Sequence, residues 1–340
     1  MDLFIEKQLI NSRSLQYTYY AGPASNATGA ADDPTLLLLH GFPHTAQLWA
    51  SVIPWLLTLG LRILVPDLLG YGGTSKPWDV SYFASDAMAS DIAEILVAEN
   101  ISSVIPIGHD WGSFLAHRYY LYYPEQVEAI IVSSSYYQAP IRNPINVTAI
   151  VEERESLIGF PLGYYYEFFS SPEAASLVSG NLQSFFSAGG TENDTMKKTF
   201  GYKDGLRNWL MADKRMKLEG FAAEPGFLEE AEAQFGGTGL ISPLKWYEAF
   251  VNGTHYEVEK DLPESADRVD KPLLHISGSK DALGPGILYE TQEARTAIKD
   301  LTTAEVDSGH FIPLEKPQEM AKTISDWLDS KKLLGPSSRR

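Results

Sequence analysis

The chain has 340 residues, of which 44% are hydrophobic and 12% aromatic, enough for one large domain with an insertion or for two modest domains. Its formal net charge of −17 repels phosphate backbones and acidic membranes, so we expect neither nucleic acid nor a membrane surface as a partner. Because the chain has no cysteine, disulfides, thiolate metal sites, iron–sulfur clusters and cysteine nucleophiles are excluded.

The first residues of the chain predict no export signal. They turn polar at Glu6 and Lys7 and lack both the basic start and the apolar core of a signal peptide. No apolar run approaches the length of a membrane span. We therefore expect a cytoplasmic, globular enzyme that works as a monomer or a homodimer.

Short continuous apolar runs, bounded by turn residues, predict strands that are buried on both faces. Such runs cover residues 36–39, 62–67, 104–108, 129–132 and 273–277. Between them lie amphipathic stretches such as residues 84–99, where apolar side chains recur at helical spacing. This alternation predicts an α/β fold with a mostly parallel, doubly wound sheet covered by helices on both faces.

The alternation of strands and helices is interrupted in the middle of the chain. The residues there are rich in Tyr, Phe, Gly and acidic side chains and contain no run typical of a buried strand. We predict a mainly helical lid at residues 139–268, inserted between two parts of one core at residues 1–138 and 269–340. A last strand near residues 302–306 and an amphipathic helix at 318–328 complete the predicted core.

The sharpest motif lies between the strand at 104–108 and a helix predicted at 114–123. Residues 107–113 read Ile-Gly-His-Asp-Trp-Gly-Ser, and a nucleophile flanked by small residues at a strand-to-helix turn is typical of a nucleophile elbow. The middle residue is Asp110, whose carboxylate is ionised at neutral pH and attacks a saturated carbon without first losing a proton. The alternative is that Asp110 caps the helix, since Asp is a favoured N-cap residue.

Three further segments favour the nucleophile over the cap. The first, residues 40–43 with the sequence His-Gly-Phe-Pro, resembles a loop that supplies an oxyanion-hole N–H, with an ordinary Gly-Pro turn as the alternative. The N–H groups of Phe42 and Trp111 would then flank the carboxyl group of Asp110. In the second segment, Asp281 follows a buried strand at the functional edge of an open sheet, although an Asp there can also cap a turn.

The third segment is a loop after the last predicted strand, in which Ser-Gly precedes His310. Among the seven histidines, His310 alone combines this Ser-Gly hinge, a post-strand loop and a position after a candidate acid. The chain order nucleophile, acid, histidine is the order expected of a fold with this elbow. We predict that Asp110 is the nucleophile, that Asp281 orients the histidine and that His310 is the general base.

Together these segments resemble the epoxide hydrolases of the α/β-hydrolase superfamily. The resemblance rests on both halves of the predicted core, at residues 40–43, 66–72, 108–112, 280–281 and 309–310, while the inserted segment fits more loosely. It implies the α/β-hydrolase fold with a helical cap, neither an organic cofactor nor a metal, and a small-molecule epoxide, apolar or aromatic, as substrate. It also implies that the nucleophile is surrounded by substrate-binding and oxyanion residues, namely His40, Phe42, Pro43, His109 and Trp111.

The resemblance further implies two lid tyrosines that hydrogen-bond the epoxide oxygen and donate a proton as the ring opens. Residues 246–250 are similar to the second tyrosine segment of the family, which points to Tyr247. A run of three tyrosines resembles the first segment, and its spacing to the aromatic and proline residues that follow favours Tyr165 over Tyr164 and Tyr166.

Three rival functions share much of this residue set. Haloalkane dehalogenases also use an Asp nucleophile followed by a Trp, here Trp111, but they usually place a second donor side chain where Phe42 stands. A ligand-binding protein without turnover would have no need of the full set of Asp110, Asp281 and His310. Acid/base chemistry on a biosynthetic intermediate, such as cyclisation or dehydration, is the third alternative.

Overall fold

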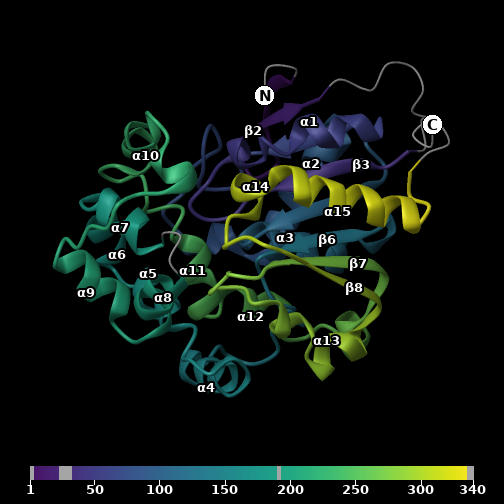
Figure 1. The fold of residues 1–340 in the computed structure, drawn as a ribbon. Helices are drawn as coiled ribbons and strands as arrows, with labels where there is room; N and C mark the ends of the chain where they lie inside the picture. The colour runs from purple at the N-terminus through teal and green to yellow at the C-terminus, as the bar shows by residue number, and fades with distance from the viewer. Residues whose placement is uncertain (1–3, 23–32, 190–192, 335–340) are drawn as a thin grey trace.

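A single twisted sheet forms the centre of the computed structural model, which describes residues 4–22, 33–189 and 193–334 (Figure 1). The strands are β1 (Ile5–Ile10), β2 (Gln16–Ala21), β3 (Thr35–Leu39), β4 (Ile63–Pro66), β5 (Val104–His109), β6 (Ile130–Ser133), β7 (Val269–Gly278) and β8 (Ile298–Val306). Within the described residues they run in the order β1-β2-β4-β3-β5-β6-β7-β8. Strands β3 to β8 are parallel to one another, and β1 and β2 add an antiparallel edge.

Helices cover both faces of the sheet. The core helices are α1 (Ile53–Leu56), α2 (Ser85–Ala98), α3 (Trp111–Tyr122), α13 (Gln292–Ala297), α14 (Ile312–Glu315) and α15 (Pro317–Ser330). Alternate residues of β3 point to opposite faces, so Leu36 and Leu38 pack in the cluster that contains α1 and α15. Leu37 and Leu39 pack in the cluster that contains α2 and α3. The fully buried strands therefore read as continuous apolar runs.

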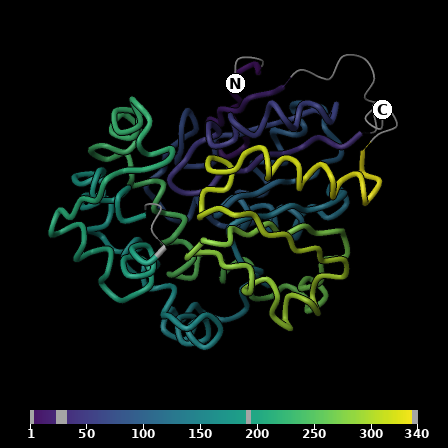
Figure 2. The backbone as a smooth tube through the Cα atoms, in the orientation of Figure 1, coloured from purple at the N-terminus to yellow at the C-terminus, as the bar shows by residue number. Residues whose placement is uncertain are grey.

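The described residues between β6 and β7 form a group of helices without a strand. They are α4 (Val147–Ile158), α5 (Tyr164–Phe169), α6 (Ala174–Ser179), α7 (Leu182–Ala188), α8 (Asn193–Met196), α9 (Gly205–Met211), α10 (Phe227–Phe235), α11 (Lys245–Val251) and α12 (Thr254–Glu259). This part, which we call the lid, lies to one side of the core (Figure 2). Its division from the core after residues 138 and 268 stays a prediction.

The α/β-hydrolase fold class predicted from the sequence is confirmed, and the predicted buried runs correspond to β3, β4, β5, β6 and β7. The sequence analysis did not predict β1 and β2, because β1 is an edge strand whose residues are exposed or half-buried and carry no continuous apolar run. Helix α3 begins at Trp111, three residues before the predicted start at 114, since the elbow leads directly into it. In the described parts of the chain, no helix combines the length and apolar character needed to cross a membrane.

A buried ion pair ties the lid to the core. Arg118 on α3 donates from Nε and Nη2 to the two carboxylate oxygens of Glu259 on α12, at 2.9 and 2.8 Å. The side chains are only 1% and 0% exposed. Glu259 also accepts from the hydroxyl of Ser85 on α2 and from the N–H of Ile141, where the chain leaves the core. The full set of bonds compensates the removal of both charges from water.

We expect Glu259→Leu to lower the free energy of unfolding by about 3–5 kcal/mol, because it leaves the charge of Arg118 buried without a counter-ion. Pairing it with Arg118→Met should recover part of the loss. Urea unfolding measures both effects. As a control, Asp326→Ala breaks an exposed pair with Lys322 and should cost less than about 1 kcal/mol. Equal losses for Glu259→Leu and Asp326→Ala would contradict the importance of the buried pair.

Candidate active site

Asp110 lies in the turn between β5 and α3 in a backbone conformation that residues with side chains rarely adopt, with φ 54° and ψ −121°. Gly112 lets α3 start directly against β3, because a Cβ there would stand 2.1 Å from the carbonyl oxygen of Leu39. The side chain of Asp110 accepts no hydrogen bond from the second or third residue of α3, as a helix-capping side chain would. Instead it lines a cavity between the core and the lid, so the capping alternative does not hold.

The loop after β3 supplies a backbone donor to this carboxylate. The N–H of Phe42 donates to Oδ1 of Asp110 at 2.8 Å, and a Cβ on Gly41 would stand 2.5 Å from the same oxygen. Burial raises the pKa of Asp110 above its ordinary value, and the positive charge of His310 acts in the opposite direction. Hydrogen bonds from the N–H groups of Trp111 and Phe42 also lower it. Both N–H groups that the sequence analysis expected beside the carboxyl group of Asp110 therefore lower its pKa.

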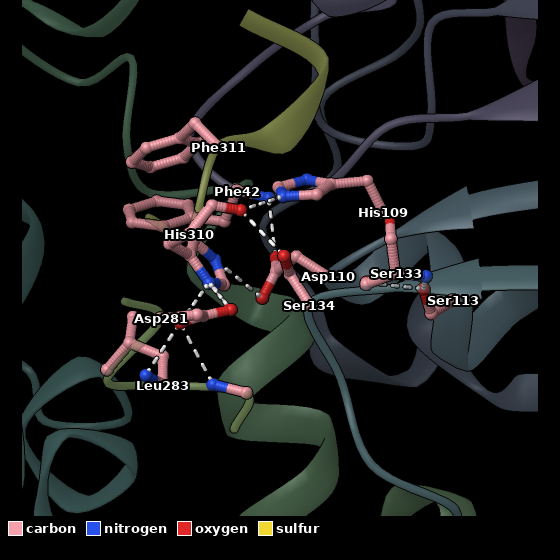
Figure 3. Close-up of polar contacts among 12 residues, drawn as sticks. Phe42, His109, Asp110, Ser113, Ser133, Ser134, Asp281, Leu283, His310 and Phe311 are labelled. Atoms are coloured by element: carbon pink, nitrogen blue, oxygen red, sulfur yellow. Dashed lines mark hydrogen bonds and ion pairs between the residues drawn. The ribbon is translucent and has the colours of Figure 1, made fainter. Parts of the chain in front are cut away.

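His310 and Asp281 lie beside the nucleophile (Figure 3). Nδ1 of His310 is 3.0 and 3.1 Å from the two carboxylate oxygens of Asp281, and its Nε2 is 3.8 Å from Oδ2 of Asp110. The N–H groups of Leu283 and Gly284 donate to Oδ1 of Asp281 at 2.8 and 3.0 Å. Asp281 thus holds the ring with Nε2 turned toward Asp110, which is the orientation that a general base for attack at that residue needs.

The protonation states of this trio depend on one another. Burial alone would lower the pKa of His310, but the carboxylates of Asp281, Asp110 and Glu315 raise it to about 8. Burial alone would raise the pKa of Asp281, but the charge and hydrogen bond of His310 lower it below its ordinary value. Asp281 is therefore ionised at neutral pH, and the protonation of His310 responds to the charge on Asp110.

Several residues hold the His310 loop in place, and only one of them is among the site residues predicted from the sequence. Glu315 on α14 accepts a hydrogen bond from the N–H of Gly309 at 2.7 Å. Ser134 Oγ and His109 Nε2 donate to the carbonyl oxygen of His310 at 2.7 and 2.8 Å. The sequence places a Glu shortly after His310, and this spacing could have identified Glu315. No sequence pattern identifies Ser134, because its role depends on contact with the loop of His310.

The cavity has two arms that meet at Asp110, Tyr165, Tyr247, Leu283 and His310. The larger arm encloses about 940 Å³ and has a mainly apolar and aromatic wall, which includes Phe42, Pro43, Phe185, Met196, Phe200, Leu218 and Phe221. The smaller arm encloses about 490 Å³, and its wall carries more polar groups, including Arg118, Ser134, Tyr136, Gln138 and Tyr166. Among the described residues, no group of three or more His, Asp or Glu side chains is arranged to hold a metal ion.

Two predicted substrate-binding residues lie outside this cavity. His40 and His109 are fully buried, and neither lines either arm. Nε2 of His40 accepts from the N–H of Leu68 at 2.9 Å, and burial lowers the pKa of His40 to about 4, although the charge of Asp67 opposes this. We therefore correct the expectation from the sequence: both histidines support loops of the site and do not reach its cavity.

The lid places two of the candidate tyrosines at the junction of the arms. Tyr165 on α5 and Tyr247 on α11 both line the two arms, whereas Tyr166 lines only the smaller arm and Tyr164 lines neither. Burial raises the pKa of Tyr165 and of Tyr247 well above the ordinary value. Both phenols are therefore protonated at neutral pH and available as donors. The spacing that favoured Tyr165 over its neighbours agrees with this placement.

The sequence profile of the α/β hydrolase fold family matches residues 34–317, and the chain belongs to this family. Among curated proteins, the chain is 29% identical to epoxide hydrolase srdG of Neurospora crassa, over 94% of this chain and 93% of that protein. It is 24% identical to bifunctional epoxide hydrolase 2 of Sus scrofa, over 87% of this chain but only 52% of that protein. A solved epoxide hydrolase from an endophytic Streptomyces shares the fold, with a TM-score of 0.79, 22% identity and coverage of 98% and 97%.

We expect Asp110→Asn to lower the pKa of His310 below its value of about 8, because the substitution removes one of the three carboxylates that raise it. Asp281→Asn should lower it further, since Asp281 is the stronger influence. NMR titration of the imidazole resonances measures both changes. Asp307→Asn, at an exposed residue paired with Lys280, is the matched control and should leave the pKa unchanged. An unchanged value in Asp110→Asn would rule out the coupling.

Proposed function

We propose that this protein hydrolyses an epoxide to a vicinal diol through a covalent ester on Asp110. The carboxylate attacks one epoxide carbon, the carbon–oxygen bond of the ring breaks, and the released oxygen takes a proton from Tyr165 or Tyr247. The product of this step is a glycol monoester on the enzyme. The phenols are suited to the task because burial keeps them protonated at neutral pH.

The second step returns the nucleophile. His310, oriented by Asp281, takes a proton from a water molecule that attacks the ester carbonyl of Asp110. The N–H groups of Phe42 and Trp111 stabilise the oxyanion of the tetrahedral intermediate. The intermediate collapses, His310 gives its proton to the leaving diol oxygen, and the second proton of the water passes from Asp110 to the phenolate, so that both the carboxylate and the phenol are restored. Water and epoxide are the only reactants consumed.

One observation carries the proposal: a carboxylate at a nucleophile elbow, backed by the Asp281 and His310 pair, shares its cavity with two protonated phenols. The named epoxide hydrolases among its relatives support the same activity. The aromatic wall of the larger arm favours an apolar or aromatic substituent on the epoxide.

A dehalogenase would need side chains that donate hydrogen bonds to a departing halide ion. An epoxide hydrolase instead needs a side chain that gives a proton to the epoxide oxygen. A hydrogen bond from the side chain of Trp111 lowers the pKa of Tyr247, so the indole N–H faces the lid phenol, a position that is also compatible with a halide donor. Phe42, however, lines the cavity with a ring that donates nothing to a halide. Two protonated tyrosines have no function in the release of a halide, so epoxide opening uses more of the site.

We expect His310→Gln to open epoxides at Asp110 but to accumulate the ester, because the base for its hydrolysis is lost. Intact-mass measurement with a reactive aromatic epoxide, such as styrene oxide, should show one substrate mass added per chain. The double variant His310→Gln/Asp110→Asn is the control and should add none. If His310→Gln accumulates no adduct while the native enzyme turns over, the ester route is wrong. An adduct with a haloalkane alone would favour the dehalogenase.

The roles of the two phenols are tested separately. Tyr165→Phe and Tyr247→Phe should each slow ester formation about 10²-fold or more, as expected for loss of a general acid, and the double variant should nearly abolish it. Single-turnover mass spectrometry in the His310→Gln background isolates this step. Tyr164→Phe is the matched control, since Tyr164 lines neither arm. A loss in Tyr164→Phe or Tyr166→Phe as large as in Tyr165→Phe would assign the donor differently.

A further inference from the structure

Arg154 is a buried cation of the lid that pairs with no acidic side chain among the described residues. It lies on α4 and is 4% exposed. In the described part of the chain, neither Nη1 nor Nη2 donates a hydrogen bond to a carboxylate or carbonyl oxygen. The other deeply buried arginine, Arg118, is fully paired with Glu259. A buried charge that lacks a counter-ion costs free energy, so its retention calls for a specific reason.

Aromatic rings surround this guanidinium. Its carbon lies 4.0 Å from the ring centre of Tyr136 and 5.5 Å from that of Tyr166, both within the range of cation–π attraction. The hydroxyls of Tyr136 and Tyr166 are 3.2 Å apart. The ring of Tyr166 stacks on that of Tyr165, with centres separated by 4.3 Å. Tyr136 and Tyr166 thus connect Arg154 with Tyr165, which lines the cavity beside Asp110.

We propose that Arg154 is a positioning residue for ring opening: its fixed positive charge, acting through the stacked Tyr166 and its hydroxyl partner Tyr136, supports proton donation by Tyr165. This inference rests on the proposed function. As the epoxide ring opens, negative charge develops on the epoxide oxygen and, once the proton leaves, on the phenol oxygen of Tyr165. A cation already in place behind the phenol stabilises that charge, most strongly where water is excluded.

The charges around Tyr165 act in the expected sense. Burial raises the pKa of Tyr165, and the positive charge of Arg154 is the largest influence that lowers it. The other groups that act on Tyr165 are tyrosines: Tyr247 and Tyr136 raise its pKa and a hydrogen bond from Tyr166 lowers it. Burial likewise raises the pKa of Tyr166, and Arg154 again opposes it. Arg154 is thus the one cation among the groups that shift these two phenols.

The direct test separates the two half-reactions. In the His310→Gln background, single-turnover intact-mass measurement with styrene oxide should show that Arg154→Met slows ester formation about tenfold or more. Arg154→Lys, which restores the charge, should recover part of this rate. Arg207→Met is the matched control, because Arg207 also lies in the lid but pairs with Glu173 near the surface, and it should leave the rate unchanged.

In the second half-reaction no phenol donates a proton to the reacting atoms. With His310 intact, Arg154→Met should therefore hydrolyse a preformed ester at the native rate, as measured by rapid quench after a single turnover. Should Arg154→Met fail to fold, Tyr166→Phe removes the hydroxyl of this connection but keeps the buried charge. It should slow ester formation less than Tyr165→Phe does and leave ester hydrolysis unchanged.

Four outcomes would overturn the inference. An unchanged rate of ester formation in Arg154→Met would show that the charge of Arg154 has no effect on ring opening. Equal slowing of both half-reactions would indicate a structural role. A loss confined to epoxides that carry a carboxylate would make Arg154 a substrate anchor. Where Tyr166→Phe is the variant used, an unchanged rate of ester formation would show that Arg154 does not act through Tyr166. Failure of the proposed function looks different, because His310→Gln alone would then form no adduct.

Discussion

The backbone of Asp110 has φ 54° and ψ −121°, values that cost free energy for a residue with a side chain, and the surrounding structure must hold it there. It does so by close packing: the N–H of Asp110 donates to the carbonyl oxygen of Ser133 on β6, and α3 starts directly against β3. The strained turn aims the carboxylate at the cavity. Every other group of the site is placed relative to it, from the loop after β3 to the loops after β7 and β8.

That placement brings three titratable groups into one small volume, and their charges couple them. With Asp110 ionised, the pKa of His310 is about 8, so much of the imidazole is protonated at neutral pH. In the proposed mechanism the carboxylate becomes a neutral ester, which removes one of the three carboxylates that raise this pKa, so the pKa falls. The histidine then loses its proton at the stage where a base is needed. In this proposal the same pair of contacts serves both half-reactions.

The sequence predicts the core of this site more fully than its surroundings, for a physical reason. Asp110, Asp281 and His310 each follow a parallel strand, and the carboxyl ends of such strands meet at one edge of the sheet. The lid gives no such rule, so three adjacent tyrosines could be ranked only by spacing and resemblance. Ser134 and Arg154 act through neighbours that are distant in the chain, and no local pattern marks them. His40 and His109 lie next to site residues in sequence, yet their side chains point away from the cavity.

The leaving group of the proposed reaction accounts for the difference in character between the lid and the core. An epoxide oxygen leaves as an alkoxide, which is strongly basic, so the reaction gains from a donor that stays protonated until the bond breaks. Burial among aromatic rings gives Tyr165 and Tyr247 this property by raising the pKa of each. The same burial, however, makes the phenolate that forms after donation unfavourable. A positive charge within the aromatic layer resolves this conflict, since it stabilises the ionised phenol without adding water to the cavity. Arg154 is positioned for that purpose, while the paired Arg118 is not, because Glu259 already neutralises its charge.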